Sequence, residues 1–168
     1  PLDTPQAAPA LPDFRELYAA HFSFTWRSLR YLGVRSQLLD DAVQEVWVAV
    51  HRRLVDFQGR SDIKTWLFGI ALNVQRNLYR AEQRRASLVP LSEELRANSC
   101  DPLLEQEGRE AWTLVMRFLG TLDDERREVF VASLLEGLLP AEVALLCGLD
   151  VPTVYSRVRS LRRAFRLW

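Results

Sequence analysis

Residues that hold metals or form disulfide frameworks are scarce in this sequence. Its 168 residues include two cysteines and two histidines. Cys100 and Cys147 lack CxxC or CxxH spacing, and His21 and His51 lie far apart. Zinc sites and disulfide scaffolds need closely spaced ligands or paired cysteines. We therefore predict no metal site and no other cofactor, and we interpret Cys147, which lies in an apolar helical run, as a small buried hydrophobe.

Long apolar runs and an excess of one charge are also missing. No segment approaches the length of a membrane span, and residues 1–12 lack the basic start and apolar centre of a signal peptide. The pattern predicts a cytoplasmic protein without membrane insertion, beginning with a flexible segment over 1–12. The 22 basic residues balance 22 acidic ones, which argues against binding nucleic acid through bulk charge alone.

Apolar residues recur at helical spacing from Phe14 onward, and no alternating strand pattern stands out. This periodicity predicts an all-α fold. The expected helices cover 13–31, 37–54, 62–85, 102–119, 123–136, 140–147 and 152–166. The acidic stretch between the third and fourth helices lacks a clear period, which is typical of a linker. We expect two small helical domains, 13–86 and 109–168, joined by a flexible acidic linker over 87–108.

The expected helix 37–54 has two different faces. One carries apolar residues at helical spacing, which predicts a buried stripe; they are Val43, Val46, Val50 and Leu54. The other carries acidic and amide groups, with an aromatic residue near its edge; its members are Asp40, Asp41, Gln44, Glu45, Val48 and Trp47. That face is either a solvated acidic surface or a docking surface for a basic partner.

The expected helix 62–85 also carries two stripes. The buried one is Ile63, Leu67, Ile70, Val74 and Leu78. The other mixes an aromatic ring, an amide and arginines; it is Thr65, Trp66, Gly69, Asn73, Arg76, Arg80 and Arg84. Rings stack on unpaired bases, amides read base edges and guanidinium groups pair with phosphates, so the mixture suits a separated nucleic-acid strand. The alternative is a packed tryptophan beside solvated arginines.

The C-terminal segment has the helix start and stop signals of a helix-turn-helix. Pro140 and Pro152 can each open a helix, and Gly148 ends the first of the two. In the second helix one side is apolar, with Val154, Val158, Leu161 and Phe165. The opposite side has small polar residues and arginines, as a recognition helix requires; they are Thr153, Ser156, Arg157, Ser160 and Arg163. An ordinary helical hairpin with a basic surface is the other interpretation.

Three blocks, in this order, resemble the sigma-70 superfamily, above all its extracytoplasmic-function (ECF, group 4) RNA polymerase sigma factors. The first is DDAVQEVW at 40–47, and the second joins FQGRS at 57–61, TWL at 65–67 and IALNV at 70–74. The third runs from EGL at 136–138 to VPTVYSR at 151–157. The likeness implies a sigma region 2 helical bundle in the first domain and a sigma region 4 helix-turn-helix in the second.

The resemblance also implies roles for individual residues. Binding of core polymerase is implied for Asp40, Asp41, Gln44, Glu45, Trp47 and Val48. Binding of the −10 element is implied for Ser61, Lys64, Thr65, Trp66, Asn73, Arg76, Asn77, Arg80, Arg84 and Arg85. Binding of the −35 element is implied for Pro152, Thr153, Tyr155, Ser156, Arg157, Arg159, Ser160 and Arg163. The family commonly has glycine where Pro152 stands and a basic residue where Tyr155 stands, so these two positions depart from its pattern.

An ECF sigma factor is expected to bind core RNA polymerase at the β′ clamp helices and the β flap. It then directs promoter recognition, −10 melting and transcription initiation, and relatives are often held inactive by an anti-sigma factor. Two other classes fit the residues alone: a polymerase-independent helix-turn-helix regulator and a helical interaction or sequestering protein. We do not expect an enzyme, because the carboxylates of 123–125 are accompanied by no nucleophile or metal partner in the sequence.

Overall fold

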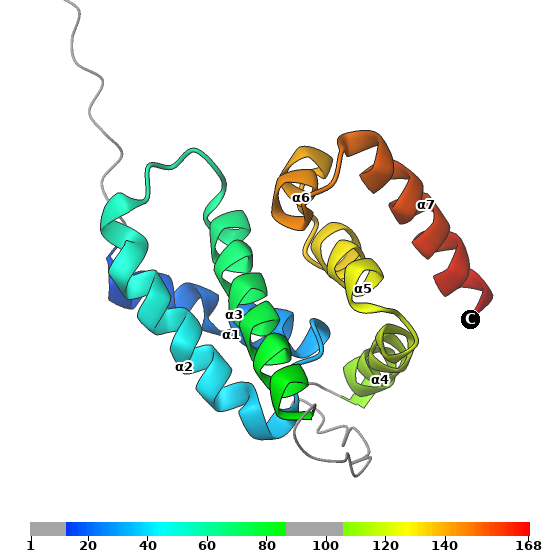
Figure 1. The fold of residues 1–168 in the computed structure, drawn as a ribbon, viewed down its shortest axis with the longest axis horizontal. Coiled ribbons are helices and arrows are strands. Elements are labelled where there is room, and N and C mark those ends of the chain that lie inside the picture. Colours follow the sequence, from blue (N-terminus) through cyan, green and yellow to red (C-terminus); the bar gives the residue numbers. More distant parts are fainter. Residues whose placement is uncertain (1–12, 87–105) are drawn as a thin grey trace, which may run out of the picture.

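The computed structural model describes residues 13–86 and 106–168, and within them every regular element is helical (Figure 1). The N-terminal bundle consists of α1 (Phe14–Tyr31), α2 (Ser36–Arg53), the 3₁₀ turn η1 (Leu54–Asp56) and α3 (Ile63–Ala86). The C-terminal bundle consists of α4 (Gln106–Gly120), α5 (Asp124–Phe130), the π-helical η2 (Val131–Leu135), α6 (Pro140–Cys147) and α7 (Val151–Leu167). The all-α prediction is confirmed, whereas segment 1–12 and most of the predicted linker lie outside the described residues.

Local hydrogen bonds explain where the C-terminal helices begin and end. Asp123 caps α5 by accepting from the backbone N–H of Arg126 at 2.8 Å, and Asp150 caps α7 by accepting from the N–H of Thr153 at 2.7 Å. Gly148 ends α6 with φ 67°, in the left-handed region that glycine enters without steric cost. The turn between α6 and α7 is thereby set by local chemistry, as the sequence predicts.

The apolar stripes predicted for the second and third helices pack inside the N-terminal bundle. In the second helical segment the whole predicted stripe is buried, namely Val43, Val46, Val50 and Leu54. In α3 the buried members are Leu67, Ile70 and Val74, and the partly buried ones are Ile63 and Leu78.

Cys147 also packs against the core, where burial raises the pKa of its thiol to about 11. A thiol that stays protonated is a poor nucleophile, so this cysteine is a packing residue. Cys100 lies outside the described residues.

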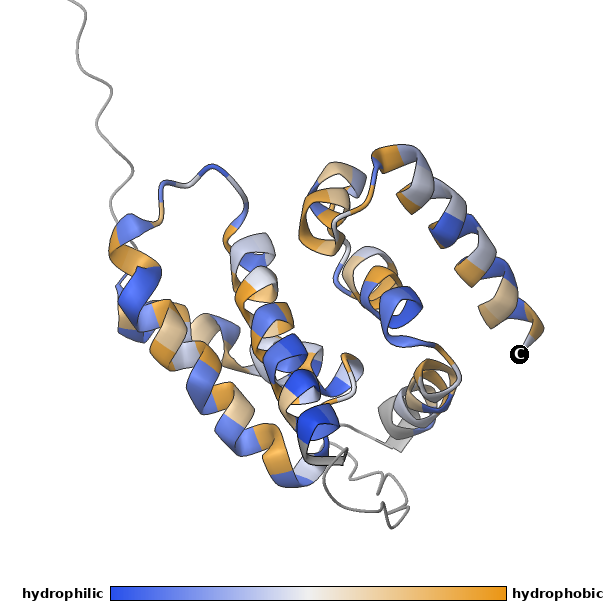
Figure 2. Cartoon of the chain, in the orientation of Figure 1, coloured by the Kyte–Doolittle hydropathy of each residue, from blue (hydrophilic) through white to orange (hydrophobic). Residues whose placement is uncertain are grey.

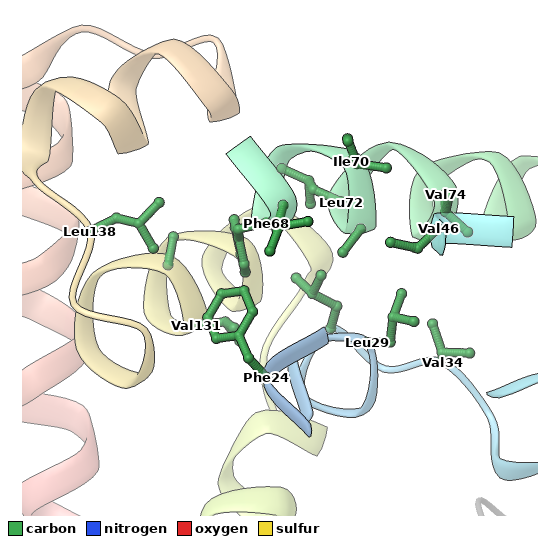
Figure 3. Packing of buried hydrophobic residues seen from close by; sticks show 14 of the residues in the cluster. Phe24, Leu29, Val34, Val46, Phe68, Ile70, Leu72, Val74, Val131 and Leu138 are labelled. Atoms are coloured by element: carbon green, nitrogen blue, oxygen red, sulfur yellow. The ribbon is translucent and has the colours of Figure 1, made fainter. Parts of the chain in front are cut away.

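The two bundles share one hydrophobic core (Figure 3). Leu29 of α1, Phe68 of α3 and Val131 of η2 are all fully buried in this one cluster. Gly69 permits close approach here, because a methyl group at that position would lie 2.9 Å from Leu146 Cδ2 of α6. The ring centroid of Trp112 in α4 also lies 4.9 Å from that of Tyr31 in α1. Packing between the bundles was not predicted from the sequence.

The hydropathy of the residues varies along the helices (Figure 2). The C-terminal half of α3 is strongly hydrophilic, and α7 alternates between hydrophobic and hydrophilic turns. In the two described stretches, no helix is both long enough and apolar enough to cross a membrane. Amphipathic helices of this kind bury one face and present the other to solvent or to a partner.

We expect Phe68→Ala to lower the free energy of unfolding by roughly 3–5 kcal/mol, because it removes a fully buried ring from the core that both bundles share. Urea denaturation followed by circular dichroism measures the change. Val55→Ala is the control, since Val55 is 70% exposed and its truncation should cost less than about 0.5 kcal/mol. Equal effects of the two substitutions would contradict the shared core.

Candidate partner and nucleic-acid interfaces

A groove between α1 and α2 lies on the surface of the N-terminal bundle. It has a volume of about 530 Å³, and aromatic residues of α1 form one wall. Its floor is Trp47, which is only 4% exposed because its ring packs against Phe14 and Tyr18 at centroid separations of 6.0 and 4.8 Å. Tyr18 and Val48 remain more than 40% exposed at its rim. The groove thus combines an apolar floor with an accessible rim.

The residues predicted to bind polymerase lie in and beside this groove. Asp40, Gln44 and Val48 line it, and Asp41 and Glu45 are exposed on the same helix. Trp47 differs from the expectation of an edge residue on the docking face, because Phe14 and Tyr18 cover it. Those two aromatic residues, and Phe22 beside them, were not included in the predicted set, although their spacing of four residues indicates a common helical face.

The residues predicted to bind the −10 element fall into separate groups in the structure. Asn73, Asn77, Arg80 and Arg84 are exposed and recur on α3 at spacings of four, three and four, so they form one continuous face, the α3 polar face. Lys64 is exposed near the start of the helix and Ser61 is half-buried in the loop before it. The side chain of Arg85 lies outside the described part of the chain.

Three members of the predicted −10 set are engaged elsewhere. The Thr65 hydroxyl donates to Glu142 Oε1 of α6 at 2.9 Å, and Thr65 is buried. Arg76 Nε donates to Glu128 Oε1 of α5 at 2.9 Å, and this hydrogen bonding raises the pKa of Arg76 above its ordinary value. Half-buried Trp66 packs on Phe57, with 4.9 Å between ring centroids. Thr65 and Arg76 therefore both contact the C-terminal bundle, and 31% of the Arg76 side chain remains exposed.

Helix α7 buries the side that the sequence predicts. Val154 and Leu161 are buried, and Phe165 packs against Phe118 and Phe130 at centroid separations of 5.0 and 5.6 Å. The opposite side is exposed and carries most of the residues predicted to bind the −35 element, namely Pro152, Tyr155, Ser156, Arg159, Ser160 and Arg163. Thr153 is half-buried at the first turn.

The two flanks of α7 differ in charge. On one flank Arg157 pairs with Glu125 of α5 at 3.1 Å, beside the acidic turn that opens α5. On the other flank Tyr155, Arg159, Arg162 and Arg166 line a shallow hollow of about 570 Å³. Arg162 and Arg166 were missed in the predicted set, although the spacing of these four residues places them on one helical face.

A half-buried carboxyl group lies between the bundles. Glu136 follows the π-helical η2, where its backbone N–H donates to the carbonyl of Val131 at 2.9 Å. Its side chain accepts a hydrogen bond from Ser28 Oγ of α1 at 2.9 Å. Burial raises the pKa of Glu136 above its ordinary value, because the charged form loses its hydration.

A pair of helical bundles, the second carrying a helix-turn-helix with arginines on its exposed helix, defines a DNA-binding protein. A family model described as Sigma-70 region 2 matches residues 17–85, and one described as Sigma-70, region 4 matches residues 113–165. RNA polymerase sigma factor CnrH of Cupriavidus metallidurans is 31% identical over 89% of this chain and 82% of its own length. The ECF RNA polymerase sigma-E factor of Escherichia coli K12 is 32% identical over 74% of this chain and 70% of its own length.

Solved structures agree with the sequence relatives. The structure of CnrH with the cytosolic domain of CnrY has a TM-score of 0.64 and 28% identity, covering 92% of this chain and 85% of that one. The fold also matches the sigma factor RpoE in complex with the anti-sigma factor NepR from Bartonella quintana, with a TM-score of 0.73 and 21% identity. The match covers 92% of this chain and 94% of that one.

The chain belongs to the sigma-70 family of RNA polymerase sigma factors, in its extracytoplasmic-function group. It functions in promoter recognition and transcription initiation, and sigma factors are initiation factors rather than enzymes.

We expect Glu136→Gln to stabilise the protein at neutral pH and to have little effect in acid. The raised pKa means that the folded state favours the protonated carboxyl, so wild-type stability falls as the pH rises through the interval between the unfolded and folded pKa values. Glutamine keeps an acceptor for Ser28 without a charge. Urea denaturation of both proteins over a pH series checks this, and a wild type more stable than the variant at neutral pH would contradict it.

Proposed function

We propose that the groove between α1 and α2 and the exposed acidic rim of α2 bind core RNA polymerase, at the β′ clamp helices that the family resemblance implies. The observation that carries this proposal is the combination of an apolar floor at Trp47 with the exposed groups of Asp40, Gln44 and Val48. Apolar cores ringed by polar groups are typical of protein interfaces. Exposed Asp41 and Glu45 would steer a basic partner helix to the groove.

The α3 polar face supports binding of the separated −10 strand. Asn73 and Asn77 offer amide donors and acceptors to base edges, and Arg80 and Arg84 offer guanidinium groups to backbone phosphates. Lys64 and Ser61 extend this surface toward the loop before α3. In this proposal Trp66 stacks on a base after leaving Phe57, since aromatic side chains hold unpaired bases by stacking.

The exposed side of α7 supports contact with the −35 duplex. Ser156 and Ser160 are short enough for close approach to the major groove, and Arg159 and Arg163 reach guanine edges or phosphates. Pro152 is accommodated at the start of the helix, where no backbone N–H is required. The contact is extended along one flank by Tyr155, Arg162 and Arg166. On the other flank, Arg157 can bind DNA only after its ion pair with Glu125 breaks.

The proposed function also covers the two domains, the place of action and further partners. We place the region 2 domain at 13–86 and the region 4 domain at 109–168, with the chain acting in the cytoplasm where polymerase transcribes. The β flap is the proposed polymerase site for the C-terminal bundle. CnrH is solved with the cytosolic domain of CnrY, and RpoE with the anti-sigma factor NepR. These complexes support an anti-sigma factor as a further partner of this chain.

We expect Val48→Arg to weaken binding to core RNA polymerase by at least about tenfold, because it places a charge over the apolar floor of the groove. Fluorescence anisotropy of the labelled chain with core enzyme measures the affinity. Val55→Arg is the matched control, since Val55 is exposed and lies outside the groove lining. A Val48→Arg chain that binds as tightly as Val55→Arg would rule out the groove as the docking site.

We expect Arg80→Ala to reduce promoter opening severalfold and to lower the salt dependence of open-complex formation, with a log–log slope smaller by about 0.7 for the lost single-strand phosphate contact. The assay is run-off transcription with core polymerase from a promoter library, followed by permanganate footprinting of a selected promoter. Arg15→Ala is the control, because Arg15 is exposed on α1 and lies outside the groove lining and the helices proposed to bind DNA. Unchanged opening by the Arg80 variant would refute the α3 polar face as the strand site.

A further inference from the structure

Three apolar side chains are exposed together at the start of α7. They are Val151, Pro152 and Tyr155, and Tyr155 is 62% exposed. Residues three and four apart lie on one face of a helix, so Tyr155 adjoins both Val151 and Pro152. We call these three residues the apolar tip of α7. Pro152 and Tyr155 both depart from the family's pattern, so the apolar tip is a feature of this chain.

Hydrogen bonds at the start of the helix hold the apolar tip in place. Asp150 Oδ1 accepts from the backbone N–H of Thr153 at 2.7 Å, and Ser156 Oγ donates to the carbonyl of Thr153 at 3.0 Å. Pro152 adds to this order because its ring fixes the backbone dihedral φ. A surface that is already ordered loses little conformational entropy when it binds a partner.

Cations border the apolar tip. Tyr155 shares a shallow hollow with Val158, Arg159 and Arg162, and within the described stretches no acidic side chain lines this hollow. The ion pair of Arg157 with Glu125 lies on the other flank of the helix. An apolar surface beside unopposed arginines suits a partner that places an apolar group among anions.

The major groove of a DNA duplex offers that combination at thymine. The C5 methyl of thymine is an apolar group in the groove, the other base edges present hydrogen-bond donors and acceptors, and phosphates flank the groove. A recognition helix brings its N-terminal residues closest to the bases. Val151 and Tyr155 are separated by about 6 Å along the axis, at a rise of about 1.5 Å per residue. The apolar tip therefore lies in the part of α7 that meets base edges.

We propose that the apolar tip of α7 selects thymine in the −35 element, with the ring of Tyr155 packed against the C5 methyl group. The inference rests on the proposed −35 site on α7. Val151 and Pro152 exclude water from the methyl group, and Arg159 holds an adjacent phosphate. Tyr155 thus determines the base preference at one position of the −35 element.

The test removes the methyl group from one thymine at a time. Promoters are first selected from a library with core polymerase and the full chain. Each thymine of the selected −35 element is then replaced by deoxyuridine, which pairs in the same way but has no methyl group. We expect thymine to recur at one fixed position. Deoxyuridine at that position should weaken promoter binding by the holoenzyme about three- to fivefold, because a buried methyl group is lost from the contact.

Substitutions of Tyr155 connect the methyl effect to this side chain. Tyr155→Ala should bind the thymine and deoxyuridine promoters equally well, whereas Tyr155→Phe keeps the ring and should retain the difference. Leu167→Ala is the matched control, because Leu167 is 79% exposed at the other end of α7, and it should retain the wild-type difference. Tyr155 is exposed, so its variants keep the helical fold, which circular dichroism verifies.

Three results would overturn the thymine contact. The first is a −35 element in which no deoxyuridine weakens binding, and the second is a Tyr155→Ala holoenzyme that still distinguishes thymine from deoxyuridine. The third is a Tyr155→Ala chain that loses affinity for core polymerase while the methyl effect persists, which would assign the apolar tip to a protein contact. Failure of the proposed −35 site gives a different result, since Arg163→Ala would then leave promoter binding unchanged. If Arg163→Ala weakens binding while removal of the methyl group does not, α7 remains the −35 site and the thymine contact is wrong.

Discussion

The apolar contact between the two bundles determines the arrangement of the other surfaces. Phe68, Leu29 and Val131 come from three different helical segments and are excluded from water together. Burial of apolar area is strong but has no direction, so it draws the bundles together without choosing their orientation. The polar pairs across the same seam supply that choice, because a buried carboxylate or guanidinium group without a partner would be costly.

This arrangement gives α3 three different environments around one helix. Its apolar stripe belongs to the N-terminal bundle, the side near Gly69 contacts α6, and the side near Arg80 is exposed. Successive side chains of a helix point in different directions around its axis. A single helix can therefore serve packing, contact between bundles and DNA binding. As a result, Arg76 is hydrogen-bonded to Glu128 whereas the neighbouring Asn77 is exposed, although both belong to the predicted DNA-binding set.

Ion pairs inside the protein use part of the positive charge of this chain, whose net charge is zero. Carboxylates of the C-terminal bundle neutralise Arg76 and Arg157, two of the arginines on the helices proposed to bind DNA. Affinity for nucleic acid depends on cations that are free to replace counterions at phosphates. We therefore expect the free chain to bind DNA weakly, which agrees with the function of a sigma factor in complex with polymerase.

The sequence by itself determined the features that depend on neighbours along one helix. The stripe of Val43, Val46 and Val50 is predictable because helical periodicity places residues three and four apart on one face, and the end of α6 is predictable because Gly148 favours a left-handed turn. The same reasoning predicts which side of α7 is exposed.

Only the tertiary structure decided which of these side chains are accessible. Thr65 and Arg76 follow the predicted face of α3 yet meet Glu142 and Glu128, which lie 77 and 52 residues away. Trp47 is likewise covered by aromatic residues of α1. Periodicity constrains side chains within a few helical turns, whereas contacts between distant segments depend on how whole helices pack. For that reason the sequence predicts the faces of the helices, and the fold determines which faces remain open to a partner.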